Sequence, residues 1–142
     1  MSDSLRVVLD TNVLISALAF QGETRKVWDL VEEGKFELYM SSFILDELSR
    51  NLSLKSKLAP EAINLLLDDV KLHATIVEPA KHITVISAKD ADNRILECAV
   101  KAKAGAIVTG NMKHIRPIGS YEGIEILTPR EFLNKYFPSI AD

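Results

Sequence analysis

The sequence contains little of the chemistry that covalent cross-links and soft metal ions need. It has one cysteine, Cys98, and three histidines that lie far apart, His73, His82 and His114. A single cysteine excludes an internal disulfide and any metal site built from several thiolates. Without a cluster of cysteine and histidine side chains, a zinc site is not expected.

The chain also lacks long apolar runs and an excess of basic residues. No apolar run approaches the roughly 20 residues that cross a bilayer, and the first residues, MSDSLRVVLD, lack the basic start and the cleavage site of a secretory signal. The net charge of −3 argues against a protein that coats nucleic acid by charge alone. With 142 residues and no internal repeat or linker, the sequence predicts one cytoplasmic globular domain over 1–142.

Aromatic residues are few, at 6 % of the chain. Trp28, Phe36, Tyr39 and Phe43 have the spacing of core or interface residues, so we do not expect them to stack on nucleic-acid bases. Cys98 has apolar neighbours and is expected in the core rather than as a nucleophile.

What the sequence does contain is an alternation of strand-like and helix-like segments. Short β-branched or alternating segments predict strands at 5–9, 36–40, 74–77, 106–109 and 123–127. Helical spacing and capping residues predict helices at 11–19, 24–33, 43–52, 60–73, 92–103 and 129–136. Strands separated by helices predict an α/β fold, with a mainly parallel sheet of about five strands and helices on both faces. The segment 82–87 is open between an extra strand and an extended loop.

Several of the predicted helix ends carry recognisable signals. Thr24 is a candidate N-cap with Gly34 as the C-cap, and either Ser41 or Ser42 caps the helix after the second strand. Thr128 and Glu131 form a capping box with a proline between them, which starts the last helix.

Polar residues follow the strands at the positions where ligands bind in open parallel sheets. Asp10 follows the first strand, Ser41 and Ser42 follow the second, and 109–111 (Thr-Gly-Asn) ends the fourth. The carboxyl ends of parallel strands lie at one edge of the sheet, and binding sites form where the strand order reverses. We therefore expect Asp10 to lie among the functional groups of the protein.

Further acidic residues lie on the predicted helices. Glu47 is one turn after Phe43 and so borders the buried face of its helix. Asp90 and Asp92 lie at the start of a helix, where an aspartate can equally serve as an N-cap. If Asp10, Glu47 and Asp92 meet in one pocket with Asn111, their charges repel one another, and a divalent cation would offset the repulsion. Carboxylate and amide oxygens suit Mg²⁺ or Mn²⁺.

Five ordered blocks of the sequence resemble the PIN domain family, and in particular its group of toxin components from toxin–antitoxin pairs. The blocks are DTNVLISAL after the first strand, SFILDEL at 42–48, DADNRILECA at 90–99, IVTGN at 107–111 and ILTPREFL at 126–133. Their order and spacing agree with the family over nearly the whole chain. The resemblance implies a three-layer α/β/α sandwich and a metal-dependent ribonuclease that uses Mg²⁺ or Mn²⁺.

The same resemblance implies an acidic quartet at Asp10, Glu47, Asp92 and position 111. This sequence departs from the family at the last position, because Asn111 stands where many relatives have aspartate. An asparagine offers a neutral oxygen and no charge, which bears on a second metal position and on the level of activity. The resemblance also implies further site-lining residues, which are Thr11, Asn12, Ser42 and Thr109.

We assign roles to this set as hypotheses. Asp10 and Asp92 would bind the principal ion directly, and Glu47 would bind it through water or act as the base. Asn111 would coordinate the ion or orient a water. Phosphates that approach an acidic pocket need a basic rim, for which the nearest candidates along the chain are Arg94, Lys113, His114 and Arg116, with solvated surface charge as the alternative for each.

Two other classes of function stay open. A receiver-like phosphoacceptor domain would need an acidic pair early in the chain and a lysine after the last strand, and neither is present. The stronger rival is a PIN domain that is catalytically weak or inactive and binds RNA or a protein. The expected partners are an RNA substrate, an antitoxin protein and further copies of this chain in a dimer or larger homo-oligomer, with no membrane.

Overall fold

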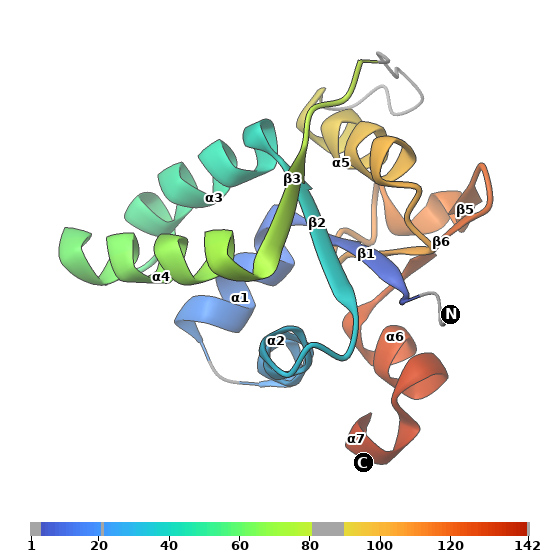
Figure 1. Cartoon of the computed structure of the whole chain (residues 1–142), viewed down its shortest axis with the longest axis horizontal. Coiled ribbons are helices and arrows are strands. Elements are labelled where there is room, and N and C mark those ends of the chain that lie inside the picture. The colour runs from blue at the N-terminus through green and yellow to red at the C-terminus, as the bar shows by residue number, and fades with distance from the viewer. Residues whose placement is uncertain (1–3, 21, 81–89, 142) are drawn as a thin grey trace.

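The computed structural model describes residues 4–20, 22–80 and 90–141 (Figure 1). The strands are β1 (Arg6–Leu9), β2 (Glu37–Ser41), β3 (Ala74–Val77), β4 (Ala106–Val108), β5 (Ser120–Tyr121) and β6 (Ile124–Leu127). The helices are α1 (Thr11–Ala19), α2 (Glu23–Glu32), α3 (Ser42–Lys55), α4 (Pro60–His73), α5 (Asp90–Ala102), α6 (Pro129–Tyr136), α7 (Pro138–Ala141) and the 3₁₀ helix η1 (Arg116–Ile118). The open segment 82–87 lies outside the described residues.

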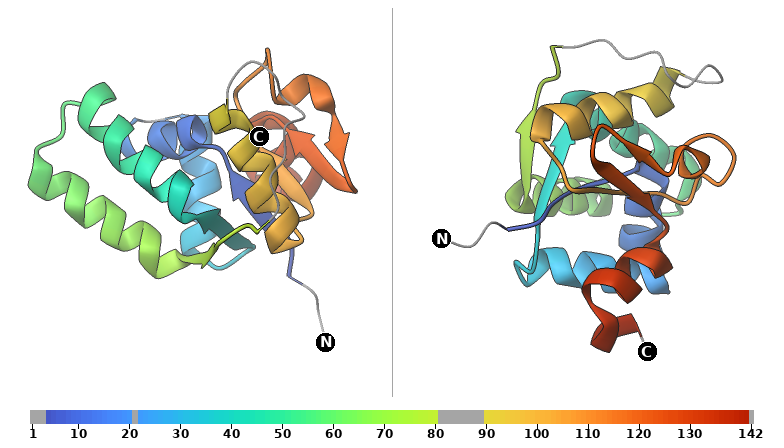
Figure 2. Two further views of the ribbon diagram at one scale, coloured as in Figure 1. Left: turned by 90° about the horizontal axis from the view of Figure 1, so that it is seen from above. Right: turned by 90° about the vertical axis from the view of Figure 1, so that its right-hand side faces the viewer.

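The strands form one sheet in the order β3-β2-β1-β4-β6-β5. All neighbouring pairs are parallel except β5 and β6. Helix α5 lies against β1 and β2 on one face, whereas α2 and α6 lie on the other, and α3 and α4 run side by side beyond the β3 edge (Figures 1 and 2). The fold is therefore the predicted three-layer α/β/α sandwich with a mainly parallel sheet.

The number of strands differs from the prediction, because the sheet has six strands rather than five. The additional strand, β5, has two residues and forms a hairpin with β6. Between them, Glu122 and Gly123 have φ angles of 50° and 83°, which is the left-handed pair that tight hairpin turns need. A two-residue strand is too short to produce an alternating pattern, so periodicity misses it.

Most predicted elements are present with small shifts at their ends. The predicted 11–19, 60–73 and 74–77 agree with α1, α4 and β3. Helix α2 starts one residue earlier than expected, and Gly22 is its N-cap instead of Thr24. The Thr24 hydroxyl lies 2.8 Å from the Ser16 hydroxyl, so it ties α2 to α1 rather than capping α2. Gly34 has a φ of 72° just after α2, as expected for the glycine that ends a helix.

The structure also resolves the open choice of the α3 cap. The Ser41 hydroxyl accepts a 3.2 Å hydrogen bond from the backbone N–H of Ile44, so Ser41 is the N-cap. The capping box of Thr128 and Glu131 is formed as predicted. Helix α5 begins at Asp90, two residues before the predicted start, so Asp92 lies inside the first turn and is not the cap.

The core lies between the sheet and the helices that cover it. Val7, Val8 and Leu9 of β1 have no exposed surface, as expected for the central strand of a sheet covered on both faces. Cys98 is buried, as predicted, and burial raises the pKa of its thiol to about 12. None of the helices formed by the described residues is both long enough and apolar enough to cross a membrane.

Of the two alternatives predicted for the aromatic residues, a core position holds for three of the four. Trp28, Phe36 and Tyr39 are buried, and Phe36 packs edge-on against Phe132 with ring centres 5.2 Å apart. Phe43 is not a core residue, because 40 % of its surface is exposed at the start of α3. The helix turns Phe43 outward since its buried face is occupied by other residues.

That buried face of α3 consists of Ile44, Leu48 and Leu52, none of which has exposed surface. The residues are spaced four apart and therefore form one stripe along the helix. Packing of this stripe fixes the rotation of α3, and with it the direction in which Glu47 points.

Replacement of Leu48 by alanine tests this packing. Loss of a fully buried leucine should lower the free energy of unfolding by about 2–5 kcal/mol, because the lost contacts leave a cavity. The matched control is Leu54→Ala on the same helix, since Leu54 is 74 % exposed; that variant should lose less than about 0.5 kcal/mol. Urea unfolding of the three proteins measures both values, and equal losses would contradict the described rotation of α3.

Candidate functional site

Asp10 lies between the end of β1 and the start of α1, and only 4 % of its surface is exposed. One carboxylate oxygen, Oδ1, accepts a 2.9 Å hydrogen bond from the backbone N–H of Val13, so Asp10 is the N-cap of α1. The other oxygen, Oδ2, accepts a hydrogen bond from the Thr109 hydroxyl. Asp10 thus combines a capping role with a place at the carboxyl edge of the sheet.

The surroundings of Asp10 make its charged form costly. Burial raises the pKa of Asp10 above its ordinary value, and the negative charge of Asp92 raises it further. The hydrogen bonds from Thr109 and from the backbone N–H groups of Val13 and Gly110 lower the pKa of Asp10 and offset part of this rise. The net effect is a carboxylate whose ionised form gains from any nearby cation.

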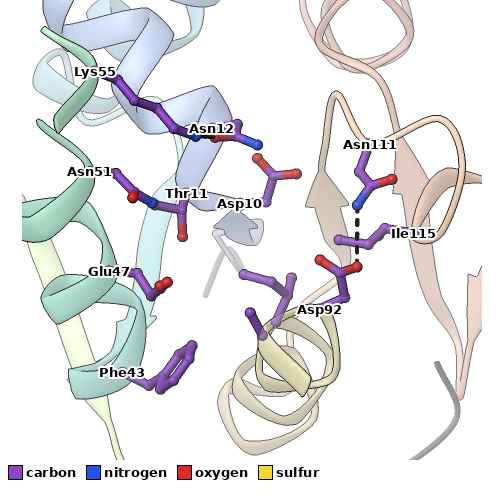
Figure 3. A pocket seen from close by; sticks show the side chains of 12 residues that line it. Asp10, Thr11, Asn12, Phe43, Glu47, Asn51, Lys55, Asp92, Asn111 and Ile115 are labelled. Atoms are coloured by element: carbon purple, nitrogen blue, oxygen red, sulfur yellow. Dashed lines mark hydrogen bonds between the residues drawn. The ribbon is translucent and has the colours of Figure 1, made fainter. Parts of the chain in front are cut away.

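Asp92, on α5, and Asn111, in the segment after β4, lie next to each other. The Asn111 side-chain nitrogen Nδ2 lies 3.3 Å from Asp92 Oδ2, so the amide donates to the carboxylate (Figure 3). The backbone N–H of Asn111 donates to the Thr109 hydroxyl at 2.9 Å. Since the same hydroxyl donates to Asp10, Thr109 links Asp10 to the loop that carries Asn111.

The amide oxygen of Asn111 faces the loop rather than the pocket. It accepts hydrogen bonds from the backbone N–H groups of Lys113 at 3.2 Å and of His114 at 2.9 Å. A flipped amide would bring its NH₂ group against these two donors, so the hydrogen bonds decide the orientation. At this position the side chain therefore presents a donor to Asp92.

Glu47 approaches the same pocket from α3. Figure 3 shows its side chain pointing into the pocket across from Asp10 and Asp92. The Glu47 carboxylate accepts a hydrogen bond from Arg50, and 15 % of the side chain is exposed. The three predicted acidic residues thus line one pocket, although they come from the first strand end, α3 and α5.

This pocket has a volume of about 200 Å³ and opens at the carboxyl edge of β1 and β4. Thr11 and Asn12, both predicted as site residues, also line it, as does Asn111. The strand order reverses between β1 and β4, which is where open α/β sheets bind their ligands.

Sequence reasoning missed several lining residues. Phe43, Asn51 and Lys55 lie on α3 at four-residue intervals from Glu47, and all three line the pocket. Their spacing puts them on one face of the helix, so the placement of Glu47 contained the signal for Phe43 and Asn51. Lys55 lies beyond the predicted helix end at residue 52, because α3 continues to Lys55. Ala91, Ile95 and Ile115 also line the pocket, with no comparable signal in the sequence.

Other predicted residues lie outside the pocket lining. The Ser42 hydroxyl donates to Glu78, and Thr109 is fully buried behind Asp10. Among the candidate basic residues, Arg94 pairs with Glu97 at 2.8 Å. Arg116 makes two 2.8 Å hydrogen bonds to the carboxylate of Glu131, which lower the pKa of Glu131 to about 2. None of the four proposed rim residues, Arg94, Lys113, His114 and Arg116, lines the pocket.

The donor set can be compared with what different metal ions require. Within residues 4–20, 22–80 and 90–141, no three Asp, Glu, His or Cys side chains approach closely enough to form a metal cage. Asp10 and Asp92 do lie close enough for one charge to affect the other. Mg²⁺ is commonly bound by one or two carboxylates, with water and substrate phosphates as the other ligands. The pair of carboxylates therefore fits a hard divalent cation.

Comparison with known proteins identifies the family. The sequence model of the PIN domain family matches residues 6–113, which include β1, the acidic residues and Asn111. The chain belongs to the PIN domain family, as the sequence blocks predicted. No curated protein matches the sequence.

Solved structures that share the fold include two VapBC proteins. One is the VapBC2 complex from Rickettsia felis bound to a DNA fragment from its promoter; the TM-score is 0.62 and the identity 19 %, with 86 % of this chain and 97 % of that chain covered. The other is VapBC-1 from nontypeable Haemophilus influenzae, with a TM-score of 0.62, 16 % identity, and coverage of 88 % and 98 %. At identities of 19 % and 16 %, the likeness shows a shared fold alone.

Replacement of Asp10 by asparagine should stabilise the protein when divalent ions are removed. Because the pKa of Asp10 is raised in the folded state, its proton is held more tightly there, so stability declines as the pH rises from about 3.8 through the raised pKa. Asparagine avoids this loss and can still accept from Val13. In chelator at pH 7, we expect the variant to gain about 1 kcal/mol, or roughly 2–4 °C in Tm.

The difference in Tm should shrink as the pH falls, because Asp10 of the original protein then takes up a proton and loses the buried charge. The control is Asp46→Asn, since Asp46 is exposed on α3 and should leave Tm unchanged. Thermal unfolding over a series of falling pH values measures the effect. A variant at Asp10 that is less stable than the original protein at pH 7 would show that burial does not penalise the charge.

Proposed function

We propose that this protein is an endoribonuclease of the PIN type that depends on Mg²⁺ or Mn²⁺ and acts as the toxin of a toxin–antitoxin pair. The observation that carries the proposal is that Asp10, Asp92 and Glu47 all line one pocket at the reversal point of the sheet. An RNA phosphodiester is the substrate class that this family and this acidic pocket favour.

Asp10 and Asp92 are the residues that would hold the metal ion, because both line the pocket and the charge of Asp92 adds to the cost of ionising Asp10. When bound, such an ion supplies a Lewis acid that activates water and stabilises charge on the phosphate. The donor set of carboxylate oxygens without sulfur or imidazole favours Mg²⁺ or Mn²⁺ over zinc.

The other residues of the pocket prepare these two carboxylates. The Thr109 hydroxyl and the backbone N–H of Val13 hold the two oxygens of Asp10 in one orientation. The Asn111 amide orients Asp92 through Nδ2. Glu47 lies across the pocket from this pair, and we assign it the acceptance of a proton from the attacking water, with Arg50 holding its far side.

The second candidate function is a PIN domain that binds RNA or protein without efficient cleavage. One observation favours it: the amide oxygen of Asn111 is engaged by the backbone of Lys113 and His114 and so is turned away from the pocket. We therefore narrow the role expected of Asn111 to that of a hydrogen-bond donor that positions Asp92. A second metal ion then lacks the ligand that aspartate would supply at this position.

The toxin assignment rests on the sequence blocks shared with toxin components and on the fold shared with two VapBC complexes. It implies an antitoxin protein as the partner and a dimer or larger homo-oligomer in the cytoplasm. The reading frame next to the gene would test the assignment directly. A small open reading frame whose product binds and inhibits this protein supports the toxin role, whereas its absence favours a nuclease with another task.

Cleavage of RNA tests the enzymatic proposal. The purified protein should cut an unstructured RNA in the presence of Mn²⁺ and stop when a chelator is added. Asp10→Asn and Asp92→Asn should each reduce the rate by about 100-fold or more, equivalent to about 2.7 kcal/mol in barrier height, since each removes a charged ligand of the ion.

The matched control for these two variants is Asp46→Asn, which removes an exposed carboxylate from α3 outside the pocket. It should cut at the original rate. Cleavage that persists unchanged in Asp10→Asn points to a contaminating nuclease and would remove the support for this site.

Replacement of Asn111 by aspartate tests the departure from the family pattern. Without metal, the new charge faces Asp92 and should lower Tm by a few degrees, roughly 1 kcal/mol. With Mn²⁺, the variant should show a larger metal-induced rise in Tm and faster cleavage, because an added carboxylate can bind the ion. Asn134→Asp adds the same charge at an exposed position of α6 and should change neither. No gain in metal response at 111 would contradict this account.

A further inference from the structure

Lys55 is the basic side chain that the fold brings to the acidic pocket. It lies in the last turn of α3, on the same face as Glu47 and Asn51, and it lines the pocket. None of the other residues that line the pocket in the described part of the chain is basic. Figure 3 shows Lys55 extending from α3 towards Asn12, beside Asp10.

The partner of Lys55 leaves its charge uncompensated. The Lys55 ammonium nitrogen Nζ donates a 3.2 Å hydrogen bond to the neutral side-chain oxygen of Asn12. Within the described residues Lys55 forms no ion pair, whereas Arg50, Arg94 and Arg116 each pair with a glutamate. No carboxylate from the described part of the chain therefore pairs with the positive charge of Lys55 at the pocket.

The position of Lys55 suits a phosphate group next to the one that reacts. Glu47 and Lys55 are eight residues apart on α3, which corresponds to about 12 Å along the helix axis. Lys55 is exposed, so its flexible side chain can move from Asn12 to a ligand at little cost. The Asn12 amide, freed from Lys55, adds a second donor at the same place.

We propose that Lys55 and Asn12 bind a phosphate of the RNA backbone that flanks the scissile phosphate. The inference rests on the proposed ribonuclease function, and it assigns Lys55 as a substrate-binding residue. The three carboxylates of the pocket repel the phosphates of an RNA strand that enters it. A lysine outside the proposed metal site at Asp10 and Asp92 offsets that repulsion and does not compete for the ion. This proposal assigns the basic rim to a residue of α3 in place of Arg94, Lys113, His114 and Arg116.

A purely structural role for Lys55 makes a different prediction. A lysine in the last turn of a helix interacts favourably with the helix dipole and so stabilises the folded protein. That role would be visible in Tm and would leave RNA binding unaltered. Measurements of both quantities on the same variants therefore separate the two roles.

The test measures binding of a fluorescent octauridylate to the full chain by anisotropy, with Ca²⁺ replacing Mg²⁺ and intact RNA verified on a gel. Lys55→Met should weaken binding about 10-fold, and the slope of log K against log salt should fall by about 0.7, the value for one phosphate contact with a single strand. Lys55→Arg should retain most of the affinity. Lys57→Met, which removes an exposed charge outside the pocket, should bind as the original protein does.

Cleavage kinetics in Mn²⁺ provide the second readout. Lys55→Met should raise KM about 10-fold with little change in kcat, because a flanking contact contributes equally before and during the reaction. Lys55→Gln serves as a second variant, since it keeps a polar group for Asn12 if methionine lowers Tm.

The outcomes distinguish this inference from the proposed function. If RNA is cut but Lys55→Met and Lys55→Gln keep the original KM and salt slope, the role of Lys55 is wrong and the nuclease stands. If RNA is bound but not cut, and loss of Lys55 alone weakens binding, the phosphate contact stands and the catalytic proposal falls. Equal weakening by Lys57→Met, or no binding of RNA by the original protein, would overturn the inference.

Discussion

The parallel pairing of β1 with β4 is the constraint on which the rest of the site depends. Its register sets Leu9 opposite Val108, and the Asp10 N–H donates to the Val108 oxygen at 3.0 Å. The next residues, Asp10 and Thr109, are therefore neighbours, and the hydroxyl of one meets the carboxylate of the other. A shift of one residue in this register would turn Thr109 to the opposite face of the sheet and leave a buried carboxylate without its donor.

Around Asp10 and Thr109 the fold carries a local energetic cost, because a carboxylate is buried there. A bound cation would lower that cost. Burial and the charge of Asp92 both raise the pKa of Asp10, and the available hydrogen bonds offset only part of that effect. Asn111 reduces the remaining repulsion by donating to Asp92. Asparagine in place of aspartate at position 111 thus lowers the repulsion in the metal-free pocket, but it also removes a charged ligand. Position 111 therefore affects both the stability of the pocket and its ability to bind metal ions.

How far the fold could be predicted depended on the length of each element. Helix α4 and the central strands have patterns long or apolar enough to be recognised. The predicted range of α4 agrees with the structure, and the ends of β1, β2 and β4 differ from the predicted ends by at most one residue. The strand β5 has two residues, too few for any periodicity, and its turn at Glu122 and Gly123 was the only local signal. The start of α2 was wrong by one residue because Thr24 bonds to Ser16, a contact made across the α1–α2 connection.

The sequence by itself determined the acidic candidates, because carboxylates that follow buried strands or border buried helix faces are costly unless they serve a site. It also determined the family through the order of its blocks. Only the tertiary structure decided which basic residue reaches the pocket, since Lys55 lies far along the chain from Asp10 and Asp92. It also decided the orientation of Asn111, because that amide is set by hydrogen bonds to the backbone of a loop, and no periodic pattern encodes them.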